Sequence, residues 1–418
     1  MLSRIYDGLR SGAWLTRERA IGYLVILTIG NLFGLGIALC RSHGWFIPAE
    51  PHFSTEFMGF YAGGRLVDQG HASLAYAPPA GVSVQDYIHS LGVAPAHRDM
   101  QRAIAGDPHL IFFTFFYPPV YWLFCAPVAL LPYYVGFVLW VAASLTFFLF
   151  ALRRVLGRWT LVLAAGAYLG FFENASVGEN SFLTSGLLAF GLLQLEKRPV
   201  LAGILFGSLC YKPHFALPVG VMLLAGKHWR AMIAAALWGG GLCVLAGFIF
   251  GFARWVEYLG MVVPHASWML RHNGFAYDIQ VTTFSSVRLL GGPVWLADVA
   301  QIVTTLFAIA SVFYASRYGS PEMRGAMLTA SFPLILSVMI DYDLTICALA
   351  VAFFYRVLAR SEALAWEKTA TAAMFAMSMV SFLLRGLWHV PLDIVIVFAF
   401  MLVCVKRVRA ERLEKAAT

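Results

Sequence analysis

Five short polar motifs interrupt long apolar runs, and they hold the side chains that could carry out chemistry. Ionisable groups within or at the ends of apolar segments are costly to bury, so they are usually functional. Their ionisable members are Glu56, Glu179, Lys212, His214, Asp341 and Asp343. A carboxylate can take a proton from a hydroxyl, and a cation can stabilise a departing phosphate. This combination suits a reaction on a lipid-linked phosphate, although a transporter of such a lipid would need similar groups.

The first motif spans residues 54–66 and predicts a helix. Ser54 is expected to cap its start. The apolar face would consist of Phe57, Phe60, Tyr61 and Leu66. We expect this helix to lie on the membrane surface as an interfacial helix. Glu56 falls in its first turn, where it is either a catalytic carboxylate or a residue that favours the positive end of the helix dipole.

The next three motifs each lie beside apolar helices. Tyr117 precedes two prolines that fix an extended turn. Glu179 and Asn180 lie between two apolar runs, where they belong to a site or simply start the second helix. Lys212 and His214 flank a proline between two further apolar runs. The alternative to a functional Lys212 is a side chain that snorkels at a helix end.

The fifth motif places Asp341 and Asp343 inside an apolar stretch, where they need cationic or hydrogen-bonding partners. One aspartate pair is a weak metal signal, and we expect neither a metal nor another cofactor. A later polar loop adds Arg271 and Arg288, which are suited to a phosphate.

The composition indicates what must position these motifs. Hydrophobic residues make up 60% of the 418 positions and charged residues 12%, about half the charged fraction of a soluble domain. Several runs of roughly 17–22 residues have almost no charge and are apolar on every face, which predicts membrane-spanning helices and argues against a barrel. We attribute the net charge of +8 to Lys and Arg at the ends of membrane helices, so no nucleic-acid partner is expected. The chain is therefore predicted to be an all-α integral membrane protein.

Basic residues orient the chain. Arg4, Arg10, Arg17 and Arg19 precede the first apolar run, and Lys406 and Arg407 follow the last, so both termini are expected in the cytoplasm. About twelve crossings fit this arrangement: 20–40, 133–152, 159–175, 180–195, 199–212, 214–226, 231–250, 293–315, 324–340, 343–358, 369–385 and 390–405.

One polytopic domain, residues 1–418, follows from this topology. It carries a large periplasmic loop at 41–116 with interfacial helices and a second periplasmic loop at 251–292. Residues 117–131 are expected to dip into the membrane without crossing it, because their prolines weaken a regular helix.

The ordered motifs resemble glycosyltransferase family 87 of the GT-C superfamily. They are Glu56-Phe57 with Phe60 to Leu66, Tyr117-Pro118-Pro119, Gly178-Glu179-Asn180, Ala202 to Pro213, Thr283 to Arg288, and Asp341 to Leu344. The resemblance implies a GT-C fold with its active site facing the periplasm. It also implies a polyprenyl-phosphate sugar donor, often of mannose, and inversion without an obligatory metal.

The resemblance also suggests roles for single residues. The family's usual base is an Asp in the first periplasmic loop, and Glu56 occupies that place. Glu179 stands where Gln is common, so the base is either Glu56 or Glu179. We expect Lys212, His214, Arg271, Arg288 and Tyr117 to bind the donor. Glu179, Asn180, Asp341 and Asp343 would support the reaction or the acceptor.

The resulting expectation is an inner-membrane glycosyltransferase that acts on a lipid or glycan acceptor, with membrane lipids around it. Two alternatives stay open. A carrier or flippase for lipid-linked sugars would do no chemistry, but such carriers often show internal repeats, and no convincing repeat is found. An acyltransferase would need a His paired with an acid, and the nearest candidates are His214 and His389.

Overall fold

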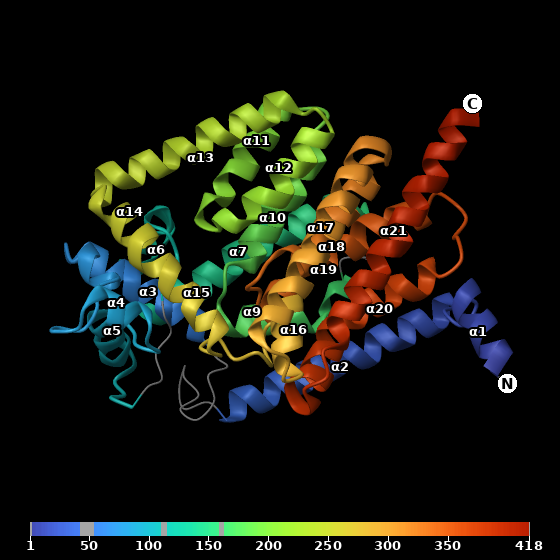
Figure 1. The fold of residues 1–418 in the computed structure, drawn as a ribbon. Coiled ribbons are helices and arrows are strands. Elements are labelled where there is room, and N and C mark those ends of the chain that lie inside the picture. Colours follow the sequence, from blue (N-terminus) through green and yellow to red (C-terminus); the bar gives the residue numbers. More distant parts are fainter. Residues whose placement is uncertain (1, 42–53, 110–114, 159–162, 418) are drawn as a thin grey trace.

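The computed structural model describes residues 2–41, 54–109, 115–158 and 163–417, and it is built of helices (Figure 1). In these ranges, extended segments pair only at an isolated bridge between Gln280 and Ile340. Five helical segments are long and apolar enough to cross a membrane: α2 (Arg17–Arg41), α7 (Tyr133–Leu156), α13 (Trp229–Phe250), α17 (Val294–Tyr318), and α20 (Glu367–Val380) continued by η8 (Ser381–Gly386). The all-α membrane class is confirmed, whereas the count of about twelve crossings stays a prediction.

Other apolar helices are shorter. They are α6 (Trp122–Ala129) after the turn η2 (Pro119–Tyr121), α9 (Leu169–Val177) after η3 (Leu163–Ala167), α10 (Ser181–Gln194), α11 (Pro199–Gly207) with η4 (Ser208–Tyr211), α12 (Ala216–Ala225) after η5 (Pro213–Phe215), α18 (Pro321–Ile335), and α19 (Thr345–Leu358) after η7 (Asp341–Leu344). The segment expected as one helix over 159–175 is interrupted before α9. Residues 159–162 of that segment lie outside the described part of the chain.

The first polar loop contains α3 (Thr55–Asp68), η1 (Ala72–Ala75), α4 (Val84–Ile88) and α5 (Pro95–Ala105). These elements gather beside α6 at one side of the molecule (Figure 1). The α3 helix is present as predicted, but its apolar face is covered by protein. Phe57, Phe60, Tyr61 and Leu66 are all buried, because α3 packs against α5 and α6.

The start of α3 also differs from the prediction. Ser54 has a φ of 55°, in the left-handed region, and its side chain does not cap the helix. Gly64 explains how closely α3 approaches α6: a Cβ at this position would lie 2.6 Å from the carbonyl oxygen of Cys125.

The second polar loop contains α14 (Ala253–Glu257), the π-helical turn η6 (Tyr258–Val262), α15 (Val263–Arg271) and α16 (Thr283–Leu289). It packs on the first loop through α15 and α4. The two loops, expected separately from the sequence, therefore meet.

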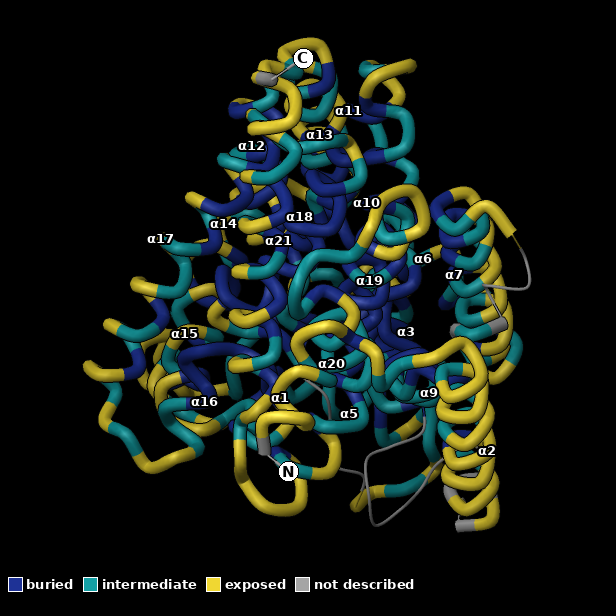
Figure 2. Tube along the Cα trace, turned by 90° about the vertical axis from the view of Figure 1, so that its right-hand side faces the viewer, coloured by how far each residue is buried: buried dark blue, intermediate teal, exposed yellow. Residues whose placement is uncertain are grey.

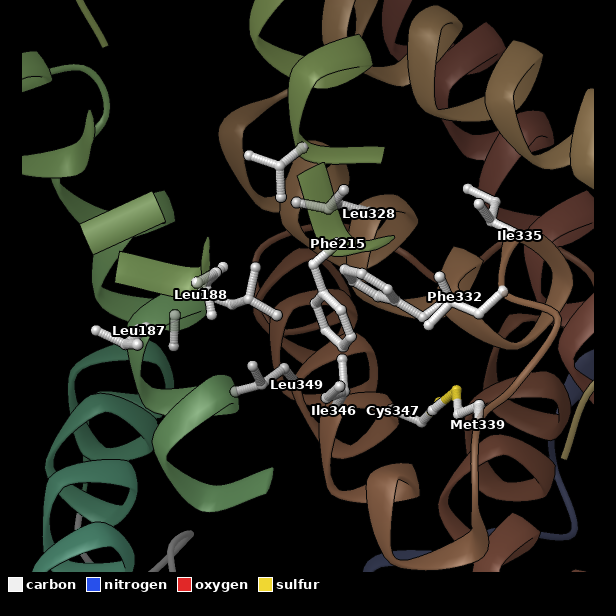
Figure 3. Packing of buried hydrophobic residues seen from close by; sticks show 14 of the residues in the cluster. Leu187, Leu188, Phe215, Leu328, Phe332, Ile335, Met339, Ile346, Cys347 and Leu349 are labelled. Carbon is white, nitrogen blue, oxygen red and sulfur yellow. The ribbon is translucent and has the colours of Figure 1, made fainter. Parts of the chain in front are cut away.

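A buried apolar core joins α10, α12, α18 and α19 (Figure 3). The rings of Phe215 and Phe332 lie 4.5 Å apart, centroid to centroid, beside Ile346. Phe215 follows Lys212 by three residues, and Ile346 follows Asp343 by three. This core therefore fixes the backbone that carries both charged residues. By contrast, α2 is exposed along most of its length (Figure 2).

Ion pairs gather at the end of the bundle opposite to Asp343. Along α19, Asp343 precedes the helix and Arg356 lies in its last turn, where it meets Glu322. Glu196, which follows α10, pairs with Arg324 at 2.6 Å. Since α10 has 14 residues, its two ends are about 20 Å apart.

Further contacts join both terminal helices to the start of α20. Arg407 of α21 (Leu392–Ala417) pairs with Glu367 at the start of α20. The backbone N–H of Trp366 donates to the carbonyl of Arg10, which closes α1 (Leu2–Ser11) onto that helix.

Candidate functional site

A buried ion cluster joins three distant parts of the chain. Lys212 Nζ lies 2.9 Å from Asp343 Oδ1 and 3.3 Å from Glu179 Oε1. The hydroxyl of Ser181 donates to the same Asp343 oxygen. All four residues are buried, with exposed fractions of 0–8%. An unpaired charge is costly to bury, so the removal of either the ammonium or a carboxylate would destabilise the groups that remain.

Aromatic side chains hold Glu179 in place. Tyr117 donates to Glu179 Oε1 at 2.6 Å, and Asn180 Nδ2 donates to the hydroxyls of Tyr117 and Tyr121. The Tyr117 and Tyr121 rings stack at 4.3 Å, and Tyr211 stacks on Tyr121 at 5.2 Å. The rigid turn predicted from the two prolines therefore presents Tyr117 to a carboxylate.

Glu56 reaches this cluster because α3 begins against the end of α9. The backbone N–H of Ser54 donates to the carbonyl of Ser176 at 2.6 Å. Gly178, with a φ of 71°, permits the approach, since a Cβ there would lie 2.7 Å from the Cβ of Phe57. Position 178 therefore requires a glycine, because a larger residue would separate the segments that carry Glu56 and Glu179.

The environment of Glu56 makes it a stronger proton acceptor than an ordinary glutamate. Burial, followed by the negative charge of Glu179, raises the pKa of Glu56 from 4.5 to about 8. The Tyr342 hydroxyl hydrogen bonds to the carboxylate, and Lys212 also lowers the pKa slightly, so these two groups offset part of the rise. A general base works best when its pKa lies near the working pH.

Asp341 lies at the edge of the same cluster. Its backbone N–H donates to the carbonyl of Ile279 at 3.0 Å, which anchors the turn η7 to the second polar loop. Burial, with a smaller contribution from Asp343, raises the pKa of Asp341 to about 7. Asp341 and Asp343 therefore differ: one is partly exposed, and the other is paired with Lys212.

Comparison with known families decides the class. The sequence model of glycosyltransferase family 87 matches residues 115–340. The chain belongs to this family. Comparison with curated proteins and with solved structures finds no match to this chain. The resemblance stated from the motifs is confirmed, and the protein is a membrane glycosyltransferase.

The family 87 match covers only part of the cluster. It includes Tyr117, Glu179 and Lys212, whereas Glu56 and Asp343 lie outside it. In the structure, Glu56 and Asp343 lie in one cluster with the residues that the family model covers. No group of three or more His, Cys, Asp or Glu within the described ranges is arranged to hold a metal ion.

Two arginines that were expected to bind the donor have other contacts in the structure. Arg271 pairs with Asp298 through both guanidinium nitrogens, at 2.9 and 3.1 Å. Arg288 stacks over Tyr277 at 5.4 Å and donates to the carbonyl of Gly292. These contacts do not involve Lys212, and a role of either arginine in donor binding stays a prediction.

The two histidines differ in position. His214 is exposed and follows the buried Lys212 by two residues. His389 is exposed between η8 and α21. Only His214 lies near enough to Lys212 and Asp343 to act on them electrostatically.

Sequence reasoning missed several members of this family 87 site. Tyr342 hydrogen bonds to Glu56, although it stands between the two aspartates that were singled out. Ser181 follows Asn180 and was considered only as part of a helix start. Tyr121 ends the short turn η2 and stacks on Tyr117, which lies in the non-helical backbone before that turn. The contacts of Tyr121, Ser181 and Tyr342 all depend on the tertiary fold, so no sequence pattern indicated them.

Proposed function

We propose that the protein transfers mannose from a polyprenyl-phosphate donor to a lipid or glycan acceptor at the periplasmic face of the inner membrane, with inversion. The observation that carries this proposal is the position of Glu56. A carboxylate with a raised pKa lies beside Glu179, Asp343 and Lys212, although it comes from a separate polar loop. A proton acceptor and a cation are thus in one site, as glycosyl transfer from a phosphate requires.

The reaction follows from these two groups. Glu56 takes the proton of an acceptor hydroxyl, and the oxygen attacks the anomeric carbon of the donor sugar. The bond between that carbon and the phosphate oxygen breaks, and polyprenyl phosphate leaves with the electron pair. Attack on the face opposite to the leaving group inverts the anomeric centre. No covalent intermediate with the protein is needed.

Lys212 stabilises the leaving phosphate in this proposal. Its ion pairs with Glu179 and Asp343 decide when the ammonium is free to do so. Burial raises the pKa of Glu179, and Lys212 offsets part of the rise. A phosphate beside Lys212 adds negative charge, which favours the protonated form of Glu179. Protonated Glu179 then releases Lys212 to the phosphate, while Asp343 keeps the ammonium in position.

The donor's prenyl chain needs an apolar surface next to the cluster. The apolar side chains around a small pocket between α3, α6 and α7 offer such a surface; they are Phe57, Phe60, Tyr61, Tyr121, Phe124, Cys125, Val128 and Trp140. Trp140 links this pocket to the site, because its Nε1 donates to the carbonyl of Gly178 at 3.0 Å. We propose that the first isoprene units lie against this apolar surface.

The test uses purified protein in lipid nanodiscs with polyprenyl-phosphate mannose and a set of glycan and glycolipid acceptors. The proposal predicts that free polyprenyl phosphate and a mannosylated product form in equal amounts. A carrier would instead move the donor across the bilayer of a proteoliposome and form no product. Transport without product would therefore replace the proposal with the carrier function.

A further inference from the structure

A second set of polar side chains lies on α9, outside the ion cluster. Asn174 is 0% exposed, and neither its Oδ1 nor its Nδ2 has a hydrogen-bond partner among the described residues. Both carboxylate oxygens of Glu173 are likewise buried without a partner in the described part of the chain. An unpaired buried polar group costs about 1–3 kcal/mol. Two successive residues that bear this cost indicate a role in binding rather than in stability.

Contacts of α9 place this set between the two carboxylate-bearing elements. At its end, the carbonyl of Ser176 accepts from the N–H of Ser54, which begins the Glu56 helix. At its start, the carbonyl of Gly170 accepts from Thr345 Oγ1 at 3.2 Å, just after the turn η7. Asn174 follows Gly170 by four residues and so lies on the same face of the helix. That face is directed at the turn carrying Asp341 and Asp343.

The charges around the set distinguish it from the phosphate side of the site. Glu173 and Asp341 are close enough to act on each other electrostatically. The cation that acts on Asp341 is Arg385, which is already paired with the buried Asp393 at 2.6 Å. Within the residues that the structure describes, this end therefore offers an anionic group no cation that lacks a partner. Neutral hydroxyl groups are suited to it, since carboxylates accept from them and an amide both donates and accepts.

We propose that Glu173, Asn174 and Asp341 form a subsite for the sugar hydroxyls of a neutral carbohydrate acceptor and direct one hydroxyl toward Glu56. The subsite rests on the proposed function for its place in the reaction. The site then has two chemically different ends. Lys212 and the exposed His214 face the donor phosphate, while α9 faces the acceptor ring. The proposal therefore favours an acceptor whose reacting part is an uncharged sugar over one that carries a phosphate.

Binding of simple glycosides tests the subsite without any donor. Saturation-transfer NMR is recorded on the full chain in nanodiscs with methyl α-mannoside and methyl β-glucoside, and with inorganic phosphate in a parallel titration. At least one glycoside should bind to the wild type. Glu173→Gln and Asn174→Leu should each weaken its binding about five- to tenfold, the effect of one neutral hydrogen bond. Absence of glycoside binding to the wild type, or equal binding to the variants, would overturn the proposal.

Thermal stability supplies the second arm. Asn174→Leu removes polar atoms that lack partners and keeps a similar volume, so its melting temperature should equal or exceed that of the wild type. Asn31→Leu is the matched control, because Asn31 is buried on α2 and its Nδ2 donates to the carbonyl of Gly166 at 3.3 Å. This control should keep glycoside binding. If Asn174→Leu fails to fold or melts well below the wild type, Asn174 is structural and the subsite is wrong.

The two proposals fail in different experiments. Loss of the donor reaction in every assay would refute the transferase, yet glycoside binding that depends on Asn174 would still stand. Conversely, normal transfer with unchanged glycoside binding in Glu173→Gln and Asn174→Leu would refute only the subsite.

Discussion

The ammonium of Lys212 lies 2.9 Å from the carboxylate of Asp343, although 131 residues separate them in the chain. Each residue stands at the start of an apolar helical segment, and the packing of Phe215 against Phe332 holds the two segments together. Glu179 completes the arrangement from the start of α10. A membrane glycosyltransferase thus collects its charged residues where several short helices begin.

Lys212→Met should weaken donor binding and also destabilise the protein. A charge-assisted contact to the phosphate is worth about 1.5–3 kcal/mol, equal to a loss of about ten- to a hundredfold in affinity. Removal of the ammonium leaves Asp343 and Glu179 buried without their cation, which costs about 3–5 kcal/mol of stability. Donor affinity and melting temperature are measured on the purified variant.

A double variant separates these two effects. Lys212→Met combined with Asp343→Asn should recover part of the stability but not the donor affinity. Lys227→Met serves as the control, since Lys227 is an exposed lysine on the loop after α12. If Lys212→Met binds the donor as tightly as the wild type, Lys212 is only the structural partner of Asp343.

Transfer should become faster as the pH rises through about 8. The base must be ionised, and burial together with Glu179 raises the pKa of Glu56 from 4.5 to about 8. The carboxylate form of Glu56 is therefore scarce in weakly acidic solution and dominant in alkaline solution. The dependence of kcat/KM on pH reports this ionisation in the free enzyme. A flat profile, or a midpoint near the ordinary value of 4.5, would contradict the assignment.

Glu179→Gln should move this ionisation to lower pH. The negative charge of Glu179 is the second largest cause of the raised pKa of Glu56, after burial. Glutamine also restores the residue that is common in the family at this position, so activity at alkaline pH should fall only mildly. The pH profile of the variant is compared with that of the wild type. An inactive Glu179→Gln variant, with Glu56→Gln still active, would assign the base to Glu179.

The topology predicts that Glu56 and Arg230 face opposite sides of the membrane. Val82→Cys in the first polar loop should react with an impermeant thiol reagent from the periplasmic side, and Arg230→Cys from the cytoplasmic side. Both positions are exposed, and both variants are made in a background without the six native cysteines. Labelling of Val82→Cys only from the cytoplasmic side would reverse the orientation of the site.

The sequence was sufficient for the class of fold and for the charged members of the cluster. Helices such as α7 and α17 follow directly from apolar runs with almost no charge. Glu56, Lys212 and Asp343 were selected because charge in such surroundings is costly. Such reasoning does not show which residues a charged side chain contacts. It therefore treated Arg271 and Arg288 like Lys212, although each arginine has its own contacts around the second polar loop.

Other features depend on tertiary packing. The apolar residues of α3 were expected to face lipid, but α5 and α6 cover them. A sequence pattern shows which face of a helix is apolar, not whether protein or lipid lies against it. Asn174 and Glu173 attracted no attention because a polar residue in a helix is ordinary until its surroundings are known.

The most direct test of the account is the rate of polyprenyl phosphate release by Glu56→Gln. Glutamine keeps the size of the side chain and removes the proton acceptor. With the same donor and acceptor as the wild type, the rate should fall about 10²–10⁴-fold, the usual contribution of a positioned general base, while donor affinity stays unchanged. Glu56→Asp, which carries the family's usual residue, should keep measurable activity. Wild-type rates from Glu56→Gln would show that Glu56 is not the base and would contradict the central claim.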